Sequence, residues 1–263
     1  MKLVWKNFVF DFTKRTYVMG ILNVTPDSFS DGGLYINRHT ACDHAMNMVE
    51  QGADIIDIGG ESTRPGSNRV TTEEEKTRVV PVIESLSGRI GVPVSVDTYK
   101  PEVAAEALEA GASLINDISG LGFSPDMAKV AARYHVPVVL MHPGNSVDRL
   151  HNETVYHELM ADIISYLKDG IHKAVSAGLP EELIVVDPGI GFGKTYRQDL
   201  EIINKLHLLC TLERPILIGV SRKAFIGDIT GGLPASERLE GTAAATSVCV
   251  MHGANIVRVH DVR

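Results

Sequence analysis

One module recurs along the chain: a helical stretch closes on Gly-Ala, and a run rich in β-branched residues follows at once. It appears as QGADIIDIGG (51–60), AGASLINDISG (110–120) and HGANIVRVHD (252–261). The glycine suits the residue after a helix, where a positive φ is needed, and the run that follows is typical of a strand. Pro93, Pro137 and Pro215 open three further apolar runs, and proline is tolerated as the first residue of a strand. Alternation of this kind predicts a parallel sheet covered by helices.

Eight strands are predicted, at residues 18–23, 54–58, 94–97, 114–117, 137–141, 184–187, 216–219 and 256–260. Helices are predicted at 38–51, 72–88, 101–110, 124–134, 154–177, 197–210 and 235–252. Thr71 and Glu74 match a capping box before the second helix, and Pro101 suits the first turn of the third. Because the strands are apolar on both faces, the sequence predicts an α/β fold, a closed (β/α)8 TIM barrel, as the single domain of residues 1–263.

Both ends of the chain carry further expectations. The segment LVWKNFVFDF (3–12) alternates in polarity, which predicts a β-hairpin that plugs the bottom of the barrel. The chain stops at Arg263, directly after the eighth strand, so the eighth helix is missing from this sequence. Val257 and Val259 are expected to face outward and to lie bare. We therefore expect the natural protein to continue with an amphipathic helix of about four or five turns.

Composition excludes several classes of protein. The 263 residues carry a net charge of -8, which argues against a nucleic-acid partner, because such a partner needs a basic face. The N-terminal segment is broken by Lys6, Asn7 and Asp11, so it lacks the apolar core of a signal peptide or membrane helix. Three widely separated cysteines, Cys42, Cys210 and Cys249, fit small core residues of a reducing compartment. The sequence predicts a cytoplasmic protein without a membrane partner.

Polar side chains close several of the predicted strands. Asp97 follows VPVSV, Asn116 follows SLI, Asp187 follows LIVV, and Lys223 lies in the GVSRKAFIG segment after the seventh strand. The carboxyl ends of barrel strands meet on one face, so these groups are expected to build one pocket. Each Asp or Asn alone fits a helix cap or a turn equally well. Together with Lys223 they indicate a ligand that bears several N–H donors.

An anion site is predicted beside that pocket. Arg258 and His260 lie two residues apart on the last strand, so they share a face and suit a phosphate group. Asn23, at the end of the first strand, would hold a hydrated Mg2+, an ion that keeps few protein ligands and relies on substrate phosphates. No HExxH motif and no zinc spacing of Cys and His is present, so no structural metal is expected.

Two long loops rich in Gly, Ser, Thr and Pro follow the first two strands, at residues 23–33 and 59–69. Loops of this length on a catalytic face are commonly lids or binding elements. Phe29 either closes over a bound ring or anchors its loop to the barrel rim. DPGIGFGKT (187–195) resembles a phosphate-binding loop, but Pro188 occupies a required glycine position and the third glycine of GxGxxG comes one residue early. Both nucleotide-binding interpretations are therefore rejected.

The motifs, taken together, resemble bacterial dihydropteroate synthase. They are MGILNVTPDSFSDGG, IIDIGGESTRPG, SVDTYKPEVA, LINDISG, VVLMH, VDPGIGFGKT, GVSRKAFIG, RLEGTAAA and VRVHDV, spread from Met19 to Val262. The resemblance implies a transferase that joins 6-hydroxymethyl-7,8-dihydropterin diphosphate to p-aminobenzoate and releases diphosphate. It also implies Mg2+ as cofactor, a homodimer and a sulfonamide target in folate biosynthesis.

The resemblance also implies roles for individual residues. The pterin would be bound by Asp97, Asn116, Met141, Asp187, Phe192 and Lys223. The diphosphate would be bound by Asn23, Thr63, Arg258 and His260, with Mg2+ on Asn23. The p-aminobenzoate pocket would be formed by Phe29, Thr63, Arg64, Pro65 and Lys223, and the catalytic residues would be Asp31, Lys223 and Arg258. Ala224 stands where the family commonly has serine, so a hydroxyl contact to p-aminobenzoate is lost.

Three alternatives remain beside this interpretation. A methyltetrahydrofolate:corrinoid methyltransferase shares a pterin-binding barrel but does not explain a serine, arginine and lysine cluster together with Arg258 and His260. A non-catalytic pterin-binding paralogue does not explain the retained loop residues. An aldolase would use Lys223 as a Schiff base, and a lowered pKa of that lysine would favour it.

Overall fold

The computed structural model describes residues 1–25, 34–63, 69–144 and 154–263 of the chain. Phe29, Asp31, Arg64 and Pro65, for which the sequence predicts roles, lie outside these residues.

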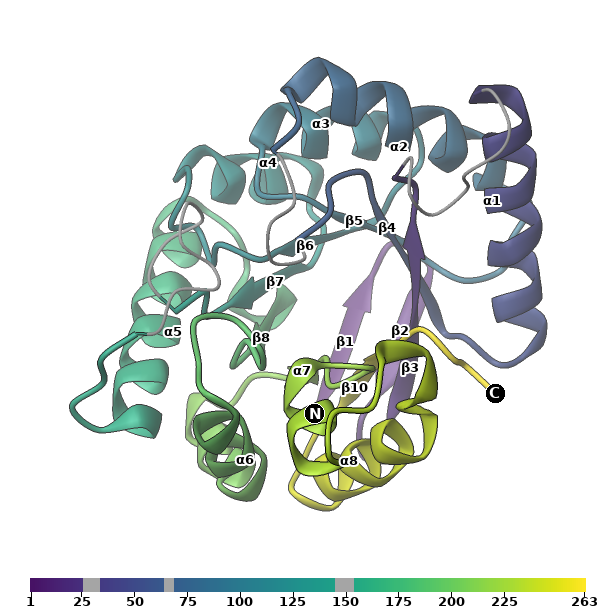
Figure 1. Ribbon diagram of the computed structural model, residues 1–263. Helices are drawn as coiled ribbons and strands as arrows, with labels where there is room; N and C mark the ends of the chain where they lie inside the picture. Colours follow the sequence, from purple (N-terminus) through teal and green to yellow (C-terminus); the bar gives the residue numbers. More distant parts are fainter. Residues whose placement is uncertain (26–33, 64–68, 145–153) are drawn as a thin grey trace.

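Eight parallel strands form one sheet in the order β8-β7-β6-β5-β4-β3-β10-β9 (Figure 1). A parallel bridge between Val186 and Ile216 joins the two ends of this order, so the sheet curls into a barrel. The predicted TIM barrel is confirmed. The strands are β3 (Tyr17–Asn23), β4 (Ile55–Gly59), β5 (Val94–Asp97), β6 (Leu114–Asp117), β7 (Val138–Met141), β8 (Ile184–Asp187), β9 (Leu217–Ile218) and β10 (Ile256–Val259).

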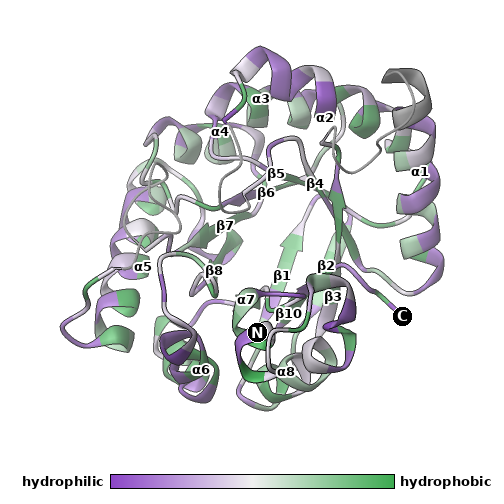
Figure 2. Ribbon diagram, viewed as in Figure 1, coloured by the Kyte–Doolittle hydropathy of each residue, from purple (hydrophilic) through white to green (hydrophobic). Residues whose placement is uncertain are grey.

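Helices surround this barrel, and their outward surfaces, most clearly on α2 and α3, are largely hydrophilic (Figure 2). The helices are α1 (Leu34–Glu50), α2 (Thr72–Leu86), α3 (Pro101–Glu109), α4 (Asp126–Tyr134), α5 (Leu159–Ser176), α6 (Tyr196–Asn204), α7 (Ala224–Ile229) and α8 (Leu239–Met251). Short 3-10 turns lie at η3 (Glu181–Leu183), η4 (Leu206–Leu212) and η5 (Ala235–Glu237).

The junctions between helices and strands follow the predicted rules. Gly52 and Gly111 end their helices with φ of 107° and 121°, a conformation that favours glycine. Pro101 occupies the first turn of α3 as predicted. The capping box at α2 is only half formed: Thr71 Oγ1 accepts from the Glu74 N–H at 3.2 Å, but the Glu74 carboxylate pairs with Arg78 instead.

Two helix predictions are corrected by the structure, and one further helix was missed. The helix predicted from residue 154 begins at Leu159, and the residues before it make other contacts: Thr154 N–H donates to Gly193 O, and His157 N–H donates to Asp162 Oδ2 in the first turn. The helix predicted at 197–210 is divided between α6 and η4. The short helix α7 was not predicted.

The N-terminal hairpin covers the amino ends of the strands, as predicted. Strands β1 (Lys2–Trp5) and β2 (Phe8–Asp11) pair in antiparallel register, with Lys2 opposite Asp11. Lys6 Nζ donates to the Ala112 carbonyl at 3.3 Å, just before β6 begins. Phe10 is buried and stacks on Tyr17 with a ring separation of 4.2 Å. The hairpin therefore closes the bottom of the barrel and leaves the opposite face for the site.

Two expectations about individual residues are wrong. Val257 and Val259 are buried, at 5% and 6% exposure, and do not form a bare face. Val262 turns back to pack against the core, beside Gly20 on β3, and β3 pairs with β10 at Val259. Cys42 and Cys249 are buried as predicted, but Cys210 is exposed.

Candidate active site

A buried network of charged and polar groups connects four strands at their carboxyl ends. Arg258 of β10 donates through Nε to Asp57 Oδ2 at 2.6 Å and through Nη2 to Asp97 Oδ2 at 2.7 Å. Asn116 of β6 donates through Nδ2 to the same Asp57 oxygen at 2.9 Å. The structure thus brings together the predicted residues Asp97, Asn116 and Arg258.

Asp57 was missed by sequence reasoning. It lies in the middle of β4, is fully buried, and connects the amide of Asn116 to the guanidinium of Arg258. Within the part of the chain that the structure describes, its second oxygen, Oδ1, is buried without a hydrogen-bond partner. The available signal was the carboxylate inside the otherwise apolar run IIDIG, because a buried charge needs a partner.

Lys223, Phe192 and Asp187 form the other side of the site. Lys223 Nζ lies 4.1 Å from the centre of the Phe192 ring, a cation–π contact. Phe192 belongs to a small apolar cluster with Tyr99, Ile118 and Met141, separate from the main core. The Asp187 carboxylate accepts from the Gly189 N–H at 2.7 Å. The structure therefore brings together four of the predicted pterin residues, Met141, Phe192, Asp187 and Lys223.

Burial dominates the electrostatics of this site. Desolvation raises the pKa of the Asp97 carboxyl to about 7, although Arg258 opposes the shift. Desolvation also raises the pKa of Asp187 to about 6, and it lowers the pKa of Lys223 to about 8 with a further contribution from Arg258. Each shift disfavours the charged form, so the pocket is suited to a ligand whose own donors and acceptors replace water around these groups.

A second buried pair supports the loops after β7 and β8. Lys194 Nζ donates to the Phe192 carbonyl at 2.9 Å and lies 3.1 Å from His142 Nδ1. Desolvation lowers the pKa of Lys194 to about 7 and that of His142 to about 3. Lys194, the lysine of the GKT sequence, therefore holds the backbone that carries Phe192. The phosphate-loop pattern that the sequence resembles does not predict this structural role.

The predicted diphosphate residues come from three strand ends: Asn23 ends β3, Thr63 follows β4, and Arg258 and His260 lie on β10 and directly after it. His260 Nδ1 is 3.0 Å from Ser221 Oγ, and Ser221 also accepts from the His260 backbone N–H at 3.1 Å. Arg222, in contrast, forms a bidentate pair with Asp261, with Nε and Nη2 at 2.9 and 2.6 Å from its two oxygens. Ala224 is exposed at the start of α7.

Asn23 ends β3 opposite Gly59, which in turn lies opposite Asp97. The described residues contain no group of three His, Cys, Asp or Glu side chains arranged for a metal ion. A single amide oxygen fits only a cation that takes its other ligands from phosphate and water, as Mg2+ does. The hydrated Mg2+ on Asn23 therefore stays a prediction, in which phosphate and water would supply the other ligands.

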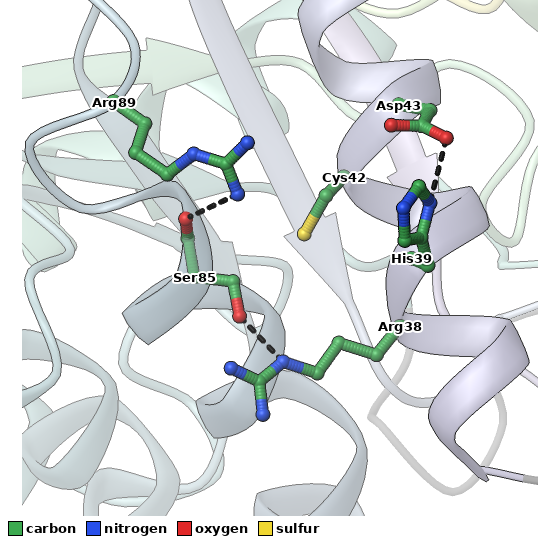
Figure 3. Close-up of a pocket in the computed structure, with 6 residues that line it drawn as sticks. All are labelled: Arg38, His39, Cys42, Asp43, Ser85 and Arg89. Carbon is green, nitrogen blue, oxygen red and sulfur yellow. Dashed lines mark hydrogen bonds and ion pairs between the residues drawn. The ribbon is translucent and has the colours of Figure 1, made fainter.

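A separate cavity of about 250 Å3 lies between α1 and α2, lined by Arg38, His39, Cys42, Asp43, Ser85 and Arg89 (Figure 3). Ser85 connects its two walls, since Arg38 Nε donates to Ser85 Oγ and Arg89 Nη1 approaches the Ser85 carbonyl at 3.5 Å. Of the predicted site residues that the structure describes, none lines this cavity.

Fold and pocket together define a (β/α)8-barrel enzyme with its site at the carboxyl ends of the strands. A family model described as pterin binding enzyme matches residues 19–260. A dihydropteroate synthase of Clostridium beijerinckii is 52% identical over 254 residues, covering 96% of this chain and 91% of that protein. The chain belongs to the pterin-binding enzyme family and, within it, to the dihydropteroate synthases.

Solved structures agree with this assignment. A dihydropteroate synthase from Clostridium difficile, crystallised in the presence of pteroic acid, has a TM-score of 0.91 and 47% identity, covering 96% of this chain and 94% of that one. The Xanthomonas albilineans enzyme with 4-aminobenzoic acid has a TM-score of 0.92 and 42% identity, covering 99% and 93%. In the described residues, no helix is long and apolar enough to cross a membrane.

Proposed function

We propose that this enzyme joins 6-hydroxymethyl-7,8-dihydropterin diphosphate to p-aminobenzoate, forming 7,8-dihydropteroate and diphosphate in the cytoplasm. The observation that carries the proposal is the network of Arg258, Asp57, Asp97 and Asn116 beside the contact of Lys223 with Phe192. It offers several buried acceptors and an apolar wall to one flat heterocycle. The membership in the dihydropteroate synthases supports the choice of substrates.

The pterin is held by groups that complement its N–H and carbonyl positions. Asp97 and Asp187 accept from ring N–H donors, Asn116 offers both an acceptor and a donor, and Lys223 donates. Met141 and Phe192 pack against the ring face. The bound ring supplies the hydrogen-bond partners that these buried groups would otherwise lack. A ligand with several N–H donors is therefore favoured.

The leaving diphosphate is bound by four residues, Arg258, His260, Asn23 and Thr63. Bound Mg2+ on Asn23 would neutralise charge on the phosphate oxygens. Arg258 stays charged at neutral pH and reaches the pocket from β10, so it stabilises negative charge as it develops on the departing oxygen.

The chemistry needs no protein nucleophile. The C–O bond to diphosphate breaks, and diphosphate leaves with the electron pair. The pterin delocalises the resulting methylene cation, which Asp31 stabilises, and the amine of p-aminobenzoate attacks the carbon and then loses a proton. Phe29, Thr63, Arg64 and Pro65 shape the p-aminobenzoate pocket. The contribution of the protein is positioning, charge stabilisation and exclusion of water.

Diphosphate release tests this proposal. We expect release that requires both substrates and Mg2+, and none when either substrate is omitted. Release that is independent of p-aminobenzoate would indicate a hydrolase and contradict the proposed transfer.

One observation favours a second candidate, an aldolase. The lowered pKa of Lys223, about 8, brings its amine closer to the reactive neutral form. The position of Nζ over the Phe192 ring, by contrast, stabilises the charged ammonium. Borohydride trapping with a carbonyl substrate separates the two functions, since only a Schiff base leaves a covalent adduct on Lys223.

We also propose that the enzyme is a homodimer that uses the outer side of α8. Four apolar side chains are exposed on this helix, those of Leu239, Val248, Val250 and Met251, and Met251 is 81% exposed. Leu239, Val250 and Met251 fall within about a third of the helix circumference, and apolar residues exposed together on one side of a helix are typical of an interface between copies. Sedimentation of Met251→Asp should show monomer where the unaltered chain shows dimer, whereas Val175→Asp on α5, 42% exposed, should leave the dimer intact. A dimer that persists in Met251→Asp would place the interface elsewhere.

A further inference from the structure

Lys100 forms a buried bridge outside the residues to which a role has been given. Its Nζ donates to Glu61 Oε2 and to Glu75 Oε2, both at 2.6 Å, and to the Val70 carbonyl at 2.8 Å. The side chains of Lys100, Glu61 and Glu75 are exposed by only 9%, 10% and 1%. All three donor positions of the ammonium are therefore used inside the protein.

The partners of Lys100 lie on both sides of the second loop. Glu61 follows β4 by two residues, and Val70 directly precedes Thr71, the N-cap of α2. Glu75 anchors the bridge to α2, and Lys100 itself precedes Pro101 at the start of α3. One ammonium group thus fixes the points where the chain leaves the barrel and where it enters the next helix.

The bridge is also connected to the pterin pocket. Tyr99 Oη donates to Glu61 Oε1 at 2.7 Å. Tyr99 belongs to the apolar cluster with Met141 and Phe192. Glu61 is therefore bound from two sides, by Lys100 and by a residue packed against the pocket wall, and Thr63 follows it by two residues.

The desolvation cost of burying Lys100 with two carboxylates indicates that the bridge serves to fix geometry more than to add stability. Burying a lysine with two carboxylates requires strong desolvation, and such groups are often replaceable by apolar residues without loss of stability. Burial accordingly raises the pKa of Glu75, although Lys100 opposes the shift. A buried ionic group that contributes little net stability can still specify one geometry.

We propose that Lys100 is a positioning residue for the reaction: by fixing Glu61 and Val70 it sets the place of Thr63 relative to the bound pterin. This inference rests on the proposed function, in which Thr63 contacts diphosphate and p-aminobenzoate. A displaced Thr63 weakens capture of the second substrate and leaves the pterin contacts of Asp97, Asn116 and Asp187 in place.

Three variants of the full chain test the proposal. Lys100→Met breaks the bridge, and Lys100→Met/Glu75→Leu also removes the Glu75 carboxylate, which would otherwise be left buried without its lysine. Lys76→Met is the matched control, because Lys76 lies on the same helix as Glu75 and pairs with Glu106 of α3 at 3.0 Å. In the described part of the chain it has no hydrogen bond or ion pair with Glu61 or Val70. Each is measured for melting temperature, pterin affinity by calorimetry, and KM and kcat from diphosphate release.

We expect Lys100→Met to raise the KM for p-aminobenzoate by about tenfold or more, as expected when a substrate-positioning group is misplaced. Its pterin affinity should stay within about twofold of the unaltered enzyme, since the hydrogen bonds of the Lys100 ammonium go to Glu61, Glu75 and Val70 and not to the residues that hold the pterin. The double variant should recover the melting temperature and keep the raised KM, and this variant decides the question if Lys100→Met does not fold.

A double variant that recovers both melting temperature and KM would overturn the proposal, because the bridge would then be structural only. A KM in Lys100→Met equal to that in Lys76→Met would overturn it as well. If the unaltered enzyme releases no diphosphate with both substrates, the proposed function itself is wrong. That failure is distinguishable from a failure of the Lys100 proposal, because it is seen in the unaltered enzyme without any variant.

Discussion

Replacing Asp57 with asparagine should weaken the site and also shift its pH dependence. The change keeps the shape of the side chain but removes the charge that accepts from Arg258 Nε at 2.6 Å and from Asn116 Nδ2 at 2.9 Å. A hydrogen bond to a charged group contributes about 1.5–3 kcal/mol and a neutral one about 0.5–1.5 kcal/mol. Both bonds go to Oδ2, so an amide oxygen in that place still accepts both but without the carboxylate charge, and we expect the free energy of unfolding to fall by about 1.5–3 kcal/mol.

The effect on Asp97 has a definite sign. The negative charge of Asp57 is one of the causes that raise the pKa of Asp97 to about 7, behind desolvation and against the opposing effect of Arg258. In Asp57→Asn, Arg258 keeps Asp97 as its only carboxylate partner in the described network. The pKa of Asp97 should therefore fall, and the loss of pterin affinity at low pH should begin at a lower pH than in the unaltered enzyme.

Calorimetric titration with a pterin between about pH 5 and pH 8, together with urea unfolding, measures both effects. Asp43→Asn is the control, since Asp43 is 54% exposed and pairs only with His39 at 2.8 Å among the described residues. Unchanged unfolding free energy and an unshifted pH profile in Asp57→Asn would refute the view that Asp57 organises Arg258 and Asn116.

Three further predictions concern the pocket. Asp97→Ala or Asp187→Ala should weaken pterin binding by about 1–3 kcal/mol for each donor left unpaired, and calorimetry showing unaltered affinity would remove that residue from the site. Pterin affinity should fall as the pH drops through about 7 and then about 6, where Asp97 and Asp187 take up protons and lose the acceptor form; an affinity that is constant or rises across that range would be inconsistent with carboxylate recognition. Finally, p-aminobenzoate should bind well only after the pterin and diphosphate are in place, and tight binding to the free enzyme, seen by calorimetry, would exclude this order.

The sequence predicted the barrel because its strands are short apolar runs between strong turn and cap signals. β3 to β10 fall within one or two residues of the predicted strands, and the hairpin lies where the alternation of LVWKNFVFDF placed it. α7 was missed because six residues that follow directly on the cationic cluster are too short for a helical period to show. Val257 and Val259 were expected to be bare and are buried, because the packing around β10, which pairs with β3 and β9, does not follow from the local sequence pattern.

The site was predicted where polar residues end strands and missed where they lie inside elements. Asp97, Asn116 and Asp187 follow apolar runs, so their convergence follows from the parallel topology. Asp57 lies within β4, and Lys100 meets Glu61 and Glu75 across 39 and 25 residues of sequence. Such contacts depend on how the helices pack around the barrel, and no local sequence pattern predicts that packing.

The most direct test of the central claim is the formation of a C–N bond between the two substrates. Purified enzyme given the pterin diphosphate, p-aminobenzoate and Mg2+ should form 7,8-dihydropteroate, identified by mass spectrometry, in equal amount to the diphosphate released. Asp187→Ala should lose most of this product. Diphosphate released without dihydropteroate, or product formed equally well by Asp187→Ala, would contradict the account of this pocket as the site of transfer.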